Sequence, residues 1–268
     1  MQGDPRQVCW VDGRLVPRDQ PMVRADDSAF SEGRGCYTSV RIQGGRARFA
    51  ERHMRRLQRG ARDLRLGSVE PAAVECALSE LAEAAFPDGE GIVRLQVSRD
   101  AGAQLHLVGV PLSLGTDRPE WSAITSPLPH SGEVLPGGHK LTNRLVLGLA
   151  AEIAREAGAD EALLFDAADR LVEGSRSNLL VVTREGTPAT PPEDLGAVAG
   201  IALEVVVERI PEVRRQPIAR ADLRAAREIV ALNAVRGARP ITHLDGRPVA
   251  GARPGSWAAR LGEALAGG

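Results

Sequence analysis

Apolar and polar residues alternate in short runs through the first part of the chain, and two longer segments repeat apolar residues every three or four positions. Alternation predicts strands, and the longer period predicts helices. Asp12-Gly13 and Gly44-Gly45 each separate two short runs and therefore predict β-hairpins. The expected strands are 8–11, 14–16, 40–42, 46–49, 92–98 and 105–110; the expected helices are 51–66 and one that begins at Pro71 and ends before Pro87.

Prolines at positions 111, 119, 127 and 129 interrupt this pattern, and we place an interdomain connection at residues 113–120. The segments expected beyond it are a helix with the stripe Leu145, Leu149, Ile153 and Ala154, strands 162–165, 171–172, 179–182 and 228–232, helices 200–210 and 257–265, and a hairpin at Asp245-Gly246. Strands mixed with helices predict the α+β class. We therefore expect a small N-terminal α/β domain at residues 1–112 and a larger domain at residues 121–268.

Composition excludes some classes of partner. The formal net charge is -1, which gives no electrostatic reason to expect binding to nucleic acid or to an anionic membrane. Residues 1–10 lack the apolar core of a signal peptide, and no apolar run approaches the ~20 residues that span a bilayer. Cys9, Cys36 and Cys76 are widely spaced, which favours reduced thiols in a cytoplasm, and the five histidines show no metal-ligand spacing. No metal site is expected.

The choice of basic residues points to one position. Of the 34 lysine and arginine residues, only Lys140 is a lysine. Arginine serves as a surface charge or an anion clamp, but it does not lose its proton near neutral pH. A deprotonated amine is what a nucleophile needs in order to form a Schiff base with a carbonyl. Lys140 is therefore a candidate for covalent chemistry, with chance drift in an arginine-rich composition as the alternative.

Several motifs occur in an order that resembles one family. Lys140 lies in the run Gly-Gly-His-Lys-Leu-Thr-Asn-Arg at 137–144; Gly-Ala-Asp-Glu-Ala-Leu-Leu follows at 158–164 and Val-Glu-Gly-Ser-Arg-Ser-Asn-Leu at 172–179. With these motifs, nearly the whole chain resembles the fold-type IV pyridoxal-phosphate enzymes. That group includes branched-chain aminotransferase, D-amino-acid aminotransferase and 4-amino-4-deoxychorismate lyase. The resemblance implies a two-domain fold whose larger domain has a mixed, barrel-like sheet, pyridoxal 5'-phosphate as cofactor, and a homodimer that acts on a small-molecule amine.

The resemblance also implies roles for individual residues. Lys140 would be the Schiff-base lysine and the base that moves protons on the substrate. Glu173 would pair with the pyridine nitrogen and keep the ring protonated, and Arg56 would hold the phosphate. The other residues at cofactor-binding positions are Asn178, Gly200, Ile201, Ala202, Asn233 and Ala234. Without the flanking matches, Glu173 would be interpreted as a solvated acid and Arg56 as part of a solvated helix face.

One segment separates the members of the family. The run Gly33-Arg-Gly-Cys-Tyr-Thr38-Ser resembles the lyases, whereas branched-chain aminotransferases tend to carry a glutamate at the position of Thr38. Thr38 is therefore a candidate proton relay beside Lys140, although a β-branched strand residue is an equally good interpretation. We expect Cys36 to be a small packing residue.

The leading hypothesis is a 4-amino-4-deoxychorismate lyase that forms 4-aminobenzoate and pyruvate for folate biosynthesis. The alternatives are an aminotransferase acting on D- or branched-chain amino acids and, as a minor one, a cofactor-binding protein without catalysis. Three features depart from what is common in the family: Glu32 stands where many relatives have tyrosine, residues 98–104 form a shorter loop than is typical of the lyases, and Ala202 and Ala234 lack hydroxyls that relatives often have at these positions. The missing hydroxyls predict weaker cofactor binding.

Overall fold

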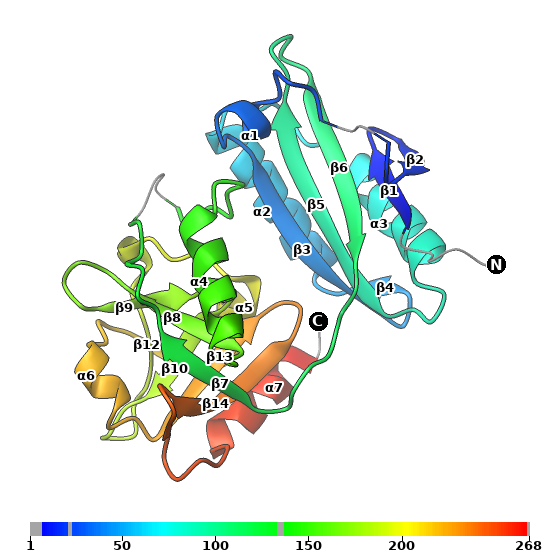
Figure 1. The fold of residues 1–268 in the computed structure, drawn as a ribbon. Helices are drawn as coiled ribbons and strands as arrows, with labels where there is room; N and C mark the ends of the chain where they lie inside the picture. The colour runs from blue at the N-terminus through cyan, green and yellow to red at the C-terminus, as the bar shows by residue number, and fades with distance from the viewer. Residues whose placement is uncertain (1–6, 21–22, 133–136, 267–268) are drawn as a thin grey trace. The chain divides into compact units, whose positions relative to one another are not determined.

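The computed structural model describes residues 7–20, 23–132 and 137–266, so residues 1–6 of the N-terminal segment lie outside it. The chain divides into two compact units (Figure 1). The first comprises Met1–Thr116 and His139–Asn143, and the second comprises Asp117–Gly138 and Arg144–Gly268. The segment around Lys140, which the sequence placed in the large domain, thus belongs to the first unit. Within the described ranges, no helix has both the length and the apolar character needed to cross a membrane.

The first unit contains an antiparallel sheet in the order β2-β1-β6-β5-β3-β4. Both predicted hairpins are confirmed: Asp12-Gly13 and Gly44-Gly45 have positive φ angles and connect paired strands, as two-residue hairpin turns require. The strands are β1 (Val8–Val11), β2 (Arg14–Pro17), β3 (Cys36–Gln43), β4 (Arg46–Ala47), β5 (Gly91–Arg99) and β6 (Leu105–Leu112).

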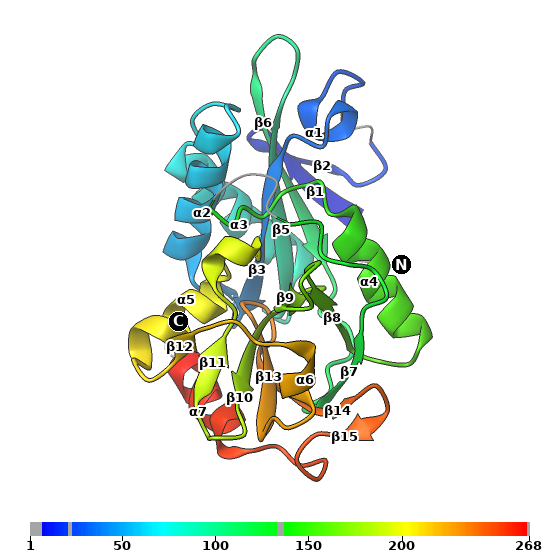
Figure 2. The ribbon, with the colours of Figure 1, turned by 90° about the vertical axis from the view of Figure 1, so that its left-hand side faces the viewer.

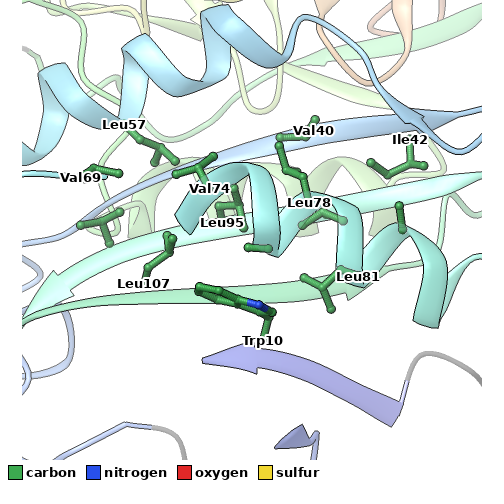
Figure 3. Close-up of a cluster of buried hydrophobic side chains, with 14 of the residues drawn as sticks. Trp10, Val40, Ile42, Leu57, Val69, Val74, Leu78, Leu81, Leu95 and Leu107 are labelled. Atoms are coloured by element: carbon green, nitrogen blue, oxygen red, sulfur yellow. The ribbon is translucent and has the colours of Figure 1, made fainter. Parts of the chain in front are cut away.

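Two helices cover one face of this sheet, and a short one, α1 (Ser28–Ser31), precedes β3. The two helices that cover the face are α2 (Ala50–Asp63), which packs on β3 and β5, and α3 (Pro71–Ala85), which packs on β1, β5 and β6. Side chains such as Trp10, Leu57 and Leu95 fill the layer between helices and sheet (Figure 3). Phe49, which was expected to end a strand, instead adopts φ 53° and precedes the first residue of α2.

The second unit contains a mixed sheet in the order β12-β11-β10-β13-β14-β7-β8-β9, with β15 paired to β14. Its last strand, β9, also contacts β10, so the sheet curls into a half-barrel. The strands are β7 (Trp121–Thr125), β8 (Glu161–Phe165), β9 (Leu171–Gly174), β10 (Asn178–Val182), β11 (Pro188–Thr190), β12 (Arg214–Arg215), β13 (Glu228–Asn233), β14 (Gly237–Leu244) and β15 (Arg247–Pro248). A mixed α+β fold with a barrel-like larger sheet is what the sequence predicted.

Helices lie on the outside of the curled sheet (Figure 2). α4 packs on β8, α7 packs on β14, and α5 packs on both α7 and β13. The helices of this unit are α4 (Leu145–Glu156), α5 (Ile201–Arg209), α6 (Arg220–Leu223) and α7 (Ser256–Ala266), with a 3-10 turn at Glu193–Leu195.

Two sequence-based expectations need correction. The helix α4 is confirmed, but its predicted apolar stripe is only partly buried: Leu145 is 69% exposed and Leu149 is 42% exposed, whereas Ala154 is buried. Ala154 packs against β8 together with Ala150, and their small side chains allow close packing of helix and strand. The proline-rich segment beyond residue 120 was not assigned a strand, yet it contains β7, in which the buried Trp121 and Ala123 alternate with partly exposed residues.

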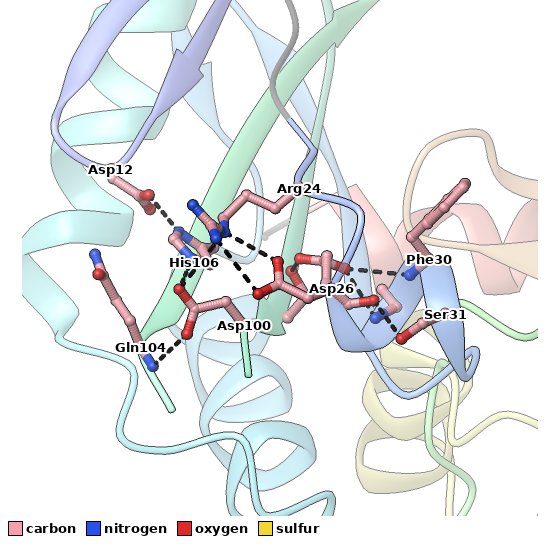
Figure 4. Close-up of polar contacts among 11 residues, drawn as sticks. Asp12, Arg24, Asp26, Phe30, Ser31, Asp100, Gln104 and His106 are labelled. Carbon is pink, nitrogen blue, oxygen red and sulfur yellow. Dashed lines mark hydrogen bonds and ion pairs between the residues drawn. The ribbon is translucent and has the colours of Figure 1, made fainter. Parts of the chain in front are cut away.

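Polar residues at one end of the first sheet form a charged cluster (Figure 4). His106 on β6 contacts Asp12 through Nδ1 at 2.7 Å and Asp100 through Nε2 at 3.4 Å. Burial lowers the pKa of His106, but the two carboxylates outweigh burial and the net effect is a raised pKa. Arg24 adds a further positive charge 4.0 Å from Asp100. The cluster ties the short loop after β5 to the hairpin between β1 and β2.

We expect the His106 contacts to stabilise the fold at acidic rather than alkaline pH. Because the folded-state pKa is raised, the stabilisation is complete below the unfolded-state pKa of about 6.5 and is lost as pH rises through the folded-state value. His106→Gln should lower the free energy of unfolding by about 0.2–1 kcal/mol at pH 6 and by less at pH 9. Urea unfolding at the two pH values measures this, with His243→Gln, at an exposed position, as the control. An equal loss at both pH values would contradict the assignment.

Candidate active site

Lys140 lies next to an isolated antiparallel β-bridge, in which Leu141 pairs with Cys36 at the start of β3. Its carbonyl accepts a 2.9 Å hydrogen bond from the Tyr37 N–H, and Thr142 N–H donates to the Gly35 carbonyl at 2.9 Å. The segment therefore pairs with the beginning of β3, and α4 begins only at Leu145. The Lys140 Nζ lies 4.9 Å from the centroid of the buried Tyr37 ring, an arrangement that favours a cation over an aromatic face. Backbone pairing thus fixes Lys140 next to Tyr37.

Thr38 follows Tyr37 and is fully buried, as is His53 on α2. Thr38 Oγ1 lies 2.5 Å from His53 Nδ1, and His53 Nε2 has no hydrogen-bond partner among the described residues. Burial lowers the pKa of His53 well below its usual value, and the positive charges of Arg56 and Lys140 lower it further. His53 is therefore neutral at physiological pH and forms a hydrogen bond with the Thr38 hydroxyl.

Arg56 lies three residues after His53, which places both side chains on one face of α2. Its electrostatic effect on His53, together with that of Lys140, shows that the three side chains are close enough to interact. The first unit therefore brings together Thr38, Arg56 and Lys140, all identified from the sequence, and adds His53, which the sequence did not single out. The sequence carried one signal for it: a histidine at the third position before the matched arginine.

Glu161 organises the turn between β9 and β10 in the second unit. It is fully buried at the start of β8 and accepts hydrogen bonds from the hydroxyls of Ser175 and Ser177, the latter at 2.6 Å, and from the Ala162 N–H at 2.9 Å. Burial raises the pKa of this carboxyl, and the hydroxyl donors act in the opposite direction. The motifs at 158–164 and 172–179 therefore form one structure, with Glu161 at its centre.

Glu173 lies just before this turn, with a side chain that is 5% exposed. Its Oε1 is 3.2 Å from His130 Nε2, and its Oε2 accepts a 3.0 Å hydrogen bond from the Val198 N–H. These two contacts, one to each oxygen, hold the carboxylate in place. His130 was not identified from the sequence, because a single histidine after Pro129 forms no recognisable motif.

Asn178 lies just after the same turn and contacts the loop that leads into α5. Its Nδ2 donates to the Val198 carbonyl at 2.9 Å. A Cβ at Gly200 would lie 1.7 Å from Asn178 Oδ1, so glycine is required there for the loop to approach Asn178. No side chain caps the N-terminus of α5 at Gly200, so the helix begins with backbone N–H groups that lack a side-chain acceptor.

The α5 N-terminus and the end of β13 contain the remaining predicted residues. Ile201 and Ala202 form the first turn of α5, and both are buried. Asn233 ends β13, one residue after the partner of Asn178 in the neighbouring strand. Its Oδ1 accepts hydrogen bonds from the N–H groups of residues 235 and 236, at 3.1 and 2.7 Å, which folds the chain around Ala234.

These groups have the chemistry that a phosphorylated aldehyde cofactor needs. The first unit supplies an amine at Lys140 and a guanidinium at Arg56, and the second supplies a buried carboxylate at Glu173. The uncapped α5 N-terminus adds backbone donors and a favourable helix dipole, which suit a phosphate. Taken separately, the groups of each unit are of the chemical types that bind pyridoxal 5'-phosphate.

Two residues that the sequence raised take no part in these clusters. Glu32 is 56% exposed and pairs with Arg34 at 2.7 Å. Cys36 is buried, and burial raises the pKa of its thiol to about 12. A Cβ at Gly60 would lie 2.9 Å from the Cys36 sulfur, so α2 packs directly on this side chain. Cys36 is a packing residue, as expected.

Comparison with known proteins identifies the group to which this chain belongs. Residues 35–244 match the family described as amino-transferase class IV. A putative branched-chain-amino-acid aminotransferase of Methanocaldococcus jannaschii is 26% identical over 95% of this chain and 93% of that protein. A bifunctional aminodeoxychorismate lyase and D-amino acid transaminase of Mycobacterium tuberculosis is 28% identical over 66% of each chain.

The fold agrees with the sequence match. The crystal structure of 4-amino-4-deoxychorismate lyase from Pseudomonas aeruginosa superposes with a TM-score of 0.81 and 26% identity, over 96% of this chain and 97% of that one. The matched sequence region contains Lys140, Glu173 and the α5 N-terminus. This protein belongs to the class IV aminotransferase family of pyridoxal-phosphate-dependent enzymes and has the fold-type IV architecture.

Proposed function

We propose that this enzyme is a 4-amino-4-deoxychorismate lyase that produces 4-aminobenzoate and pyruvate. The observation that carries the proposal is the buried contact between Thr38 Oγ1 and His53 Nδ1 at 2.5 Å. The residue after Tyr37 in β3 therefore carries a hydroxyl and not a carboxylate. The Tyr37 N–H donates a hydrogen bond to the Lys140 carbonyl. His53 would hold this hydroxyl in place, and Thr38 would act as a relay that gives its proton to the leaving group as it takes one from the protonated Lys140 Nζ, so that no charge remains on the hydroxyl.

Lys140 supplies the base in this scheme. Lys140 would hold the cofactor through its Nζ, and the amine, once free, would remove the proton from the amine-bearing carbon of the substrate. When bound, pyridoxal phosphate withdraws electron density from that carbon and so makes its proton removable. Lysine is suited to this role, whereas the arginines of this chain retain their protons.

The remaining steps conserve atoms and electrons without an oxidant. As the proton leaves the ring carbon, the bond between the ring and the enolpyruvyl oxygen breaks and the ring becomes aromatic. The leaving enolate takes up one proton, from Lys140 Nζ or Thr38 Oγ1, and becomes pyruvate. The substrate thus divides into two products of the same total composition, 4-aminobenzoate and pyruvate.

Holding the cofactor is the proposed role of the other site residues. Arg56 and the backbone N–H groups of the α5 N-terminus, at Ile201 and Ala202, would bind the phosphate, and Glu173 would keep the pyridine nitrogen protonated. Gly200 and Asn178 maintain the shape of the loop before α5. Asn233 shapes a second loop around Ala234, which carries no hydroxyl for the phosphate.

An aminotransferase acting on D- or branched-chain amino acids is the second candidate, because the relatives from M. jannaschii and M. tuberculosis carry these activities in their names. It would use the same base at Lys140 but return the proton to the cofactor. Conversion of the bound cofactor to its amine form by an amino acid alone would support this candidate.

The homodimer and the cytoplasmic location remain predictions of the family resemblance and of the cysteine spacing. Leu145 and Leu149, exposed one turn apart on α4, are consistent with a further apolar contact. Sedimentation of the cofactor-loaded protein would measure the oligomeric state.

We expect Lys140→Ala to abolish product formation. The assay mixes cofactor-loaded enzyme with freshly generated aminodeoxychorismate and measures 4-aminobenzoate and pyruvate, which should appear in equal amounts with the wild type. Lys140→Arg is the matched control, since it keeps the positive charge but cannot supply a neutral amine near neutral pH. Turnover by either variant would refute the role of Lys140. Absence of product with the wild type, combined with transfer of an amino group from amino acids, would assign the enzyme to the aminotransferases.

Thr38→Val should reduce the kcat for lyase turnover by about a hundredfold, because it removes the hydroxyl but keeps a β-branched side chain of similar volume. Thr38→Ser should retain most of the activity. The control is Ser39→Ala, which removes a hydroxyl from the next residue of β3. If Thr38→Val and Ser39→Ala turn over equally fast, the proton relay is wrong.

Ala202→Thr should tighten cofactor binding roughly tenfold, about the contribution of one hydrogen bond to a charged group. Ala202→Val introduces nearly the same shape at this buried position without a hydroxyl and serves as the matched control. Titration of the apoenzyme with pyridoxal phosphate, followed by absorbance, gives the two dissociation constants. Equal constants for Thr and Val would show that the absent hydroxyl does not limit cofactor affinity.

A further inference from the structure

The buried contact between His130 and Glu173 is a feature that the scheme above does not use. Both side chains are 5% exposed, and His130 Nε2 lies 3.2 Å from Glu173 Oε1. The other carboxylate oxygen, Oε2, accepts from the Val198 N–H. The carboxylate is therefore held at both oxygens, once by backbone and once by a titratable side chain.

β8 explains how the two residues meet. On one edge of β8, Leu164 pairs with Glu173 of β9. On the other edge, the segment after β7 continues alongside β8, with the Ser126 N–H bonded to the Leu163 carbonyl and the His130 N–H bonded to the Phe165 carbonyl, each at 2.8 Å. His130 and Glu173 thus lie on opposite sides of the same strand, and the sheet determines their approach.

The backbone also selects the tautomer of His130. The Gly132 N–H donates to His130 Nδ1 at 3.1 Å, so Nδ1 acts as an acceptor and carries no proton. The proton of the neutral imidazole must then be on Nε2, the nitrogen that faces Glu173. The ring is consequently a neutral donor aimed at the carboxylate, with its orientation fixed from behind by the main chain.

A neutral donor has a specific effect on a buried carboxylate. It favours the ionised form of the carboxylate through a hydrogen bond, as any donor does. Unlike a lysine or arginine at the same place, it adds no full positive charge that would compete with a cationic ring for the carboxylate. An ionised carboxylate in a buried setting is in turn a strong partner for a protonated pyridine nitrogen.

We propose that His130 is a positioning residue of the active site: through Nε2–H it holds the Glu173 carboxylate in the orientation in which it pairs with the pyridine nitrogen of the bound cofactor, and thereby keeps that nitrogen protonated. This inference rests on the proposed role of Glu173 as the partner of that nitrogen. A purely structural alternative, in which the pair only braces the segment after β7 against β9, would affect stability but not the protonation of the cofactor.

The test uses enzyme loaded with pyridoxal phosphate labelled with ¹⁵N in the ring, because the ¹⁵N chemical shift distinguishes the protonated from the unprotonated nitrogen. In the wild type and in His130→Gln, whose side-chain amide can still donate, the nitrogen should be protonated. In His130→Leu, which removes the donor but keeps the bulk, the unprotonated fraction should rise and kcat should fall about tenfold or more. A fully protonated nitrogen in His130→Leu would overturn the inference.

The Glu173→Gln variant distinguishes a failure of the proposed role of Glu173 from a failure of the proposed role of His130. If the nitrogen stays protonated in Glu173→Gln, the proposed role of Glu173 itself is wrong. If it loses its proton in Glu173→Gln but keeps it in His130→Leu, Glu173 has its proposed role and only the inference about His130 fails.

A measurement on the wild type guards against a variant that does not fold or does not load cofactor. Long-range ¹H–¹⁵N correlation spectra of the histidine rings report which nitrogen of His130 carries the proton, assigned by comparison with His130→Gln. The Nε2–H tautomer is expected. The Nδ1–H tautomer would overturn the proposal, since Nε2 would then have no proton to donate to Glu173.

Discussion

The second unit depends on one buried carboxylate, Glu161. Burying an ionisable group without partners is costly, and the raised pKa of Glu161 reflects that cost. The chain offsets it with the hydroxyls of Ser175 and Ser177 and with a backbone N–H. Because these two serines lie in the turn between β9 and β10, the same hydrogen bonds fix the direction in which both strands leave the turn. Glu173 and Asn178, on either side of it, are positioned as a consequence.

Hydrogen bonds connect Glu173 and Asn178 to the loop that leads into the N-terminus of α5. Val198 donates its N–H to Glu173 and accepts from Asn178 through its carbonyl, so a single residue connects both side chains to the loop before α5. Gly200 lets this loop approach Asn178. The helix begins there without a side-chain cap, which leaves its N–H groups available to a phosphate. Carboxylate, amide and helix N-terminus are therefore parts of one connected network.

In the first unit, the cationic side chains of Arg56 and Lys140 lie near a buried polar pair, Thr38 and His53. α2 carries both His53 and Arg56, and β3 carries Thr38 beside the segment that contains Lys140. His53 tolerates two nearby positive charges because it stays neutral, as its lowered pKa requires. The neutral ring of His53 forms a hydrogen bond with the Thr38 hydroxyl. Regular secondary structure thus supplies the spacing, and burial supplies the protonation state.

The sequence by itself determined most helices and strands, though not β7, and also the α+β class, the family and its cofactor. Periodicity and turn residues are local signals, so both hairpins of the first sheet and α3 with its initial Pro71 were found as predicted. Its local signals did not separate the buried part of the α4 stripe, Ala154, from the exposed part, Leu145 and Leu149. The roles assigned to Lys140, Thr38, Glu173 and Arg56 came from motifs and remain proposals.

Only the tertiary structure decided which polar side chains meet. His130 and Glu173 are 43 residues apart, Thr38 and His53 are 15 apart, and Glu161 and Ser177 are 16 apart. Strand pairing and helix packing close these distances, and no local pattern records them. Burial then sets the protonation of His53 and Glu161, because the pKa of a side chain depends on the dielectric and the charges around it and not on its neighbours in the sequence.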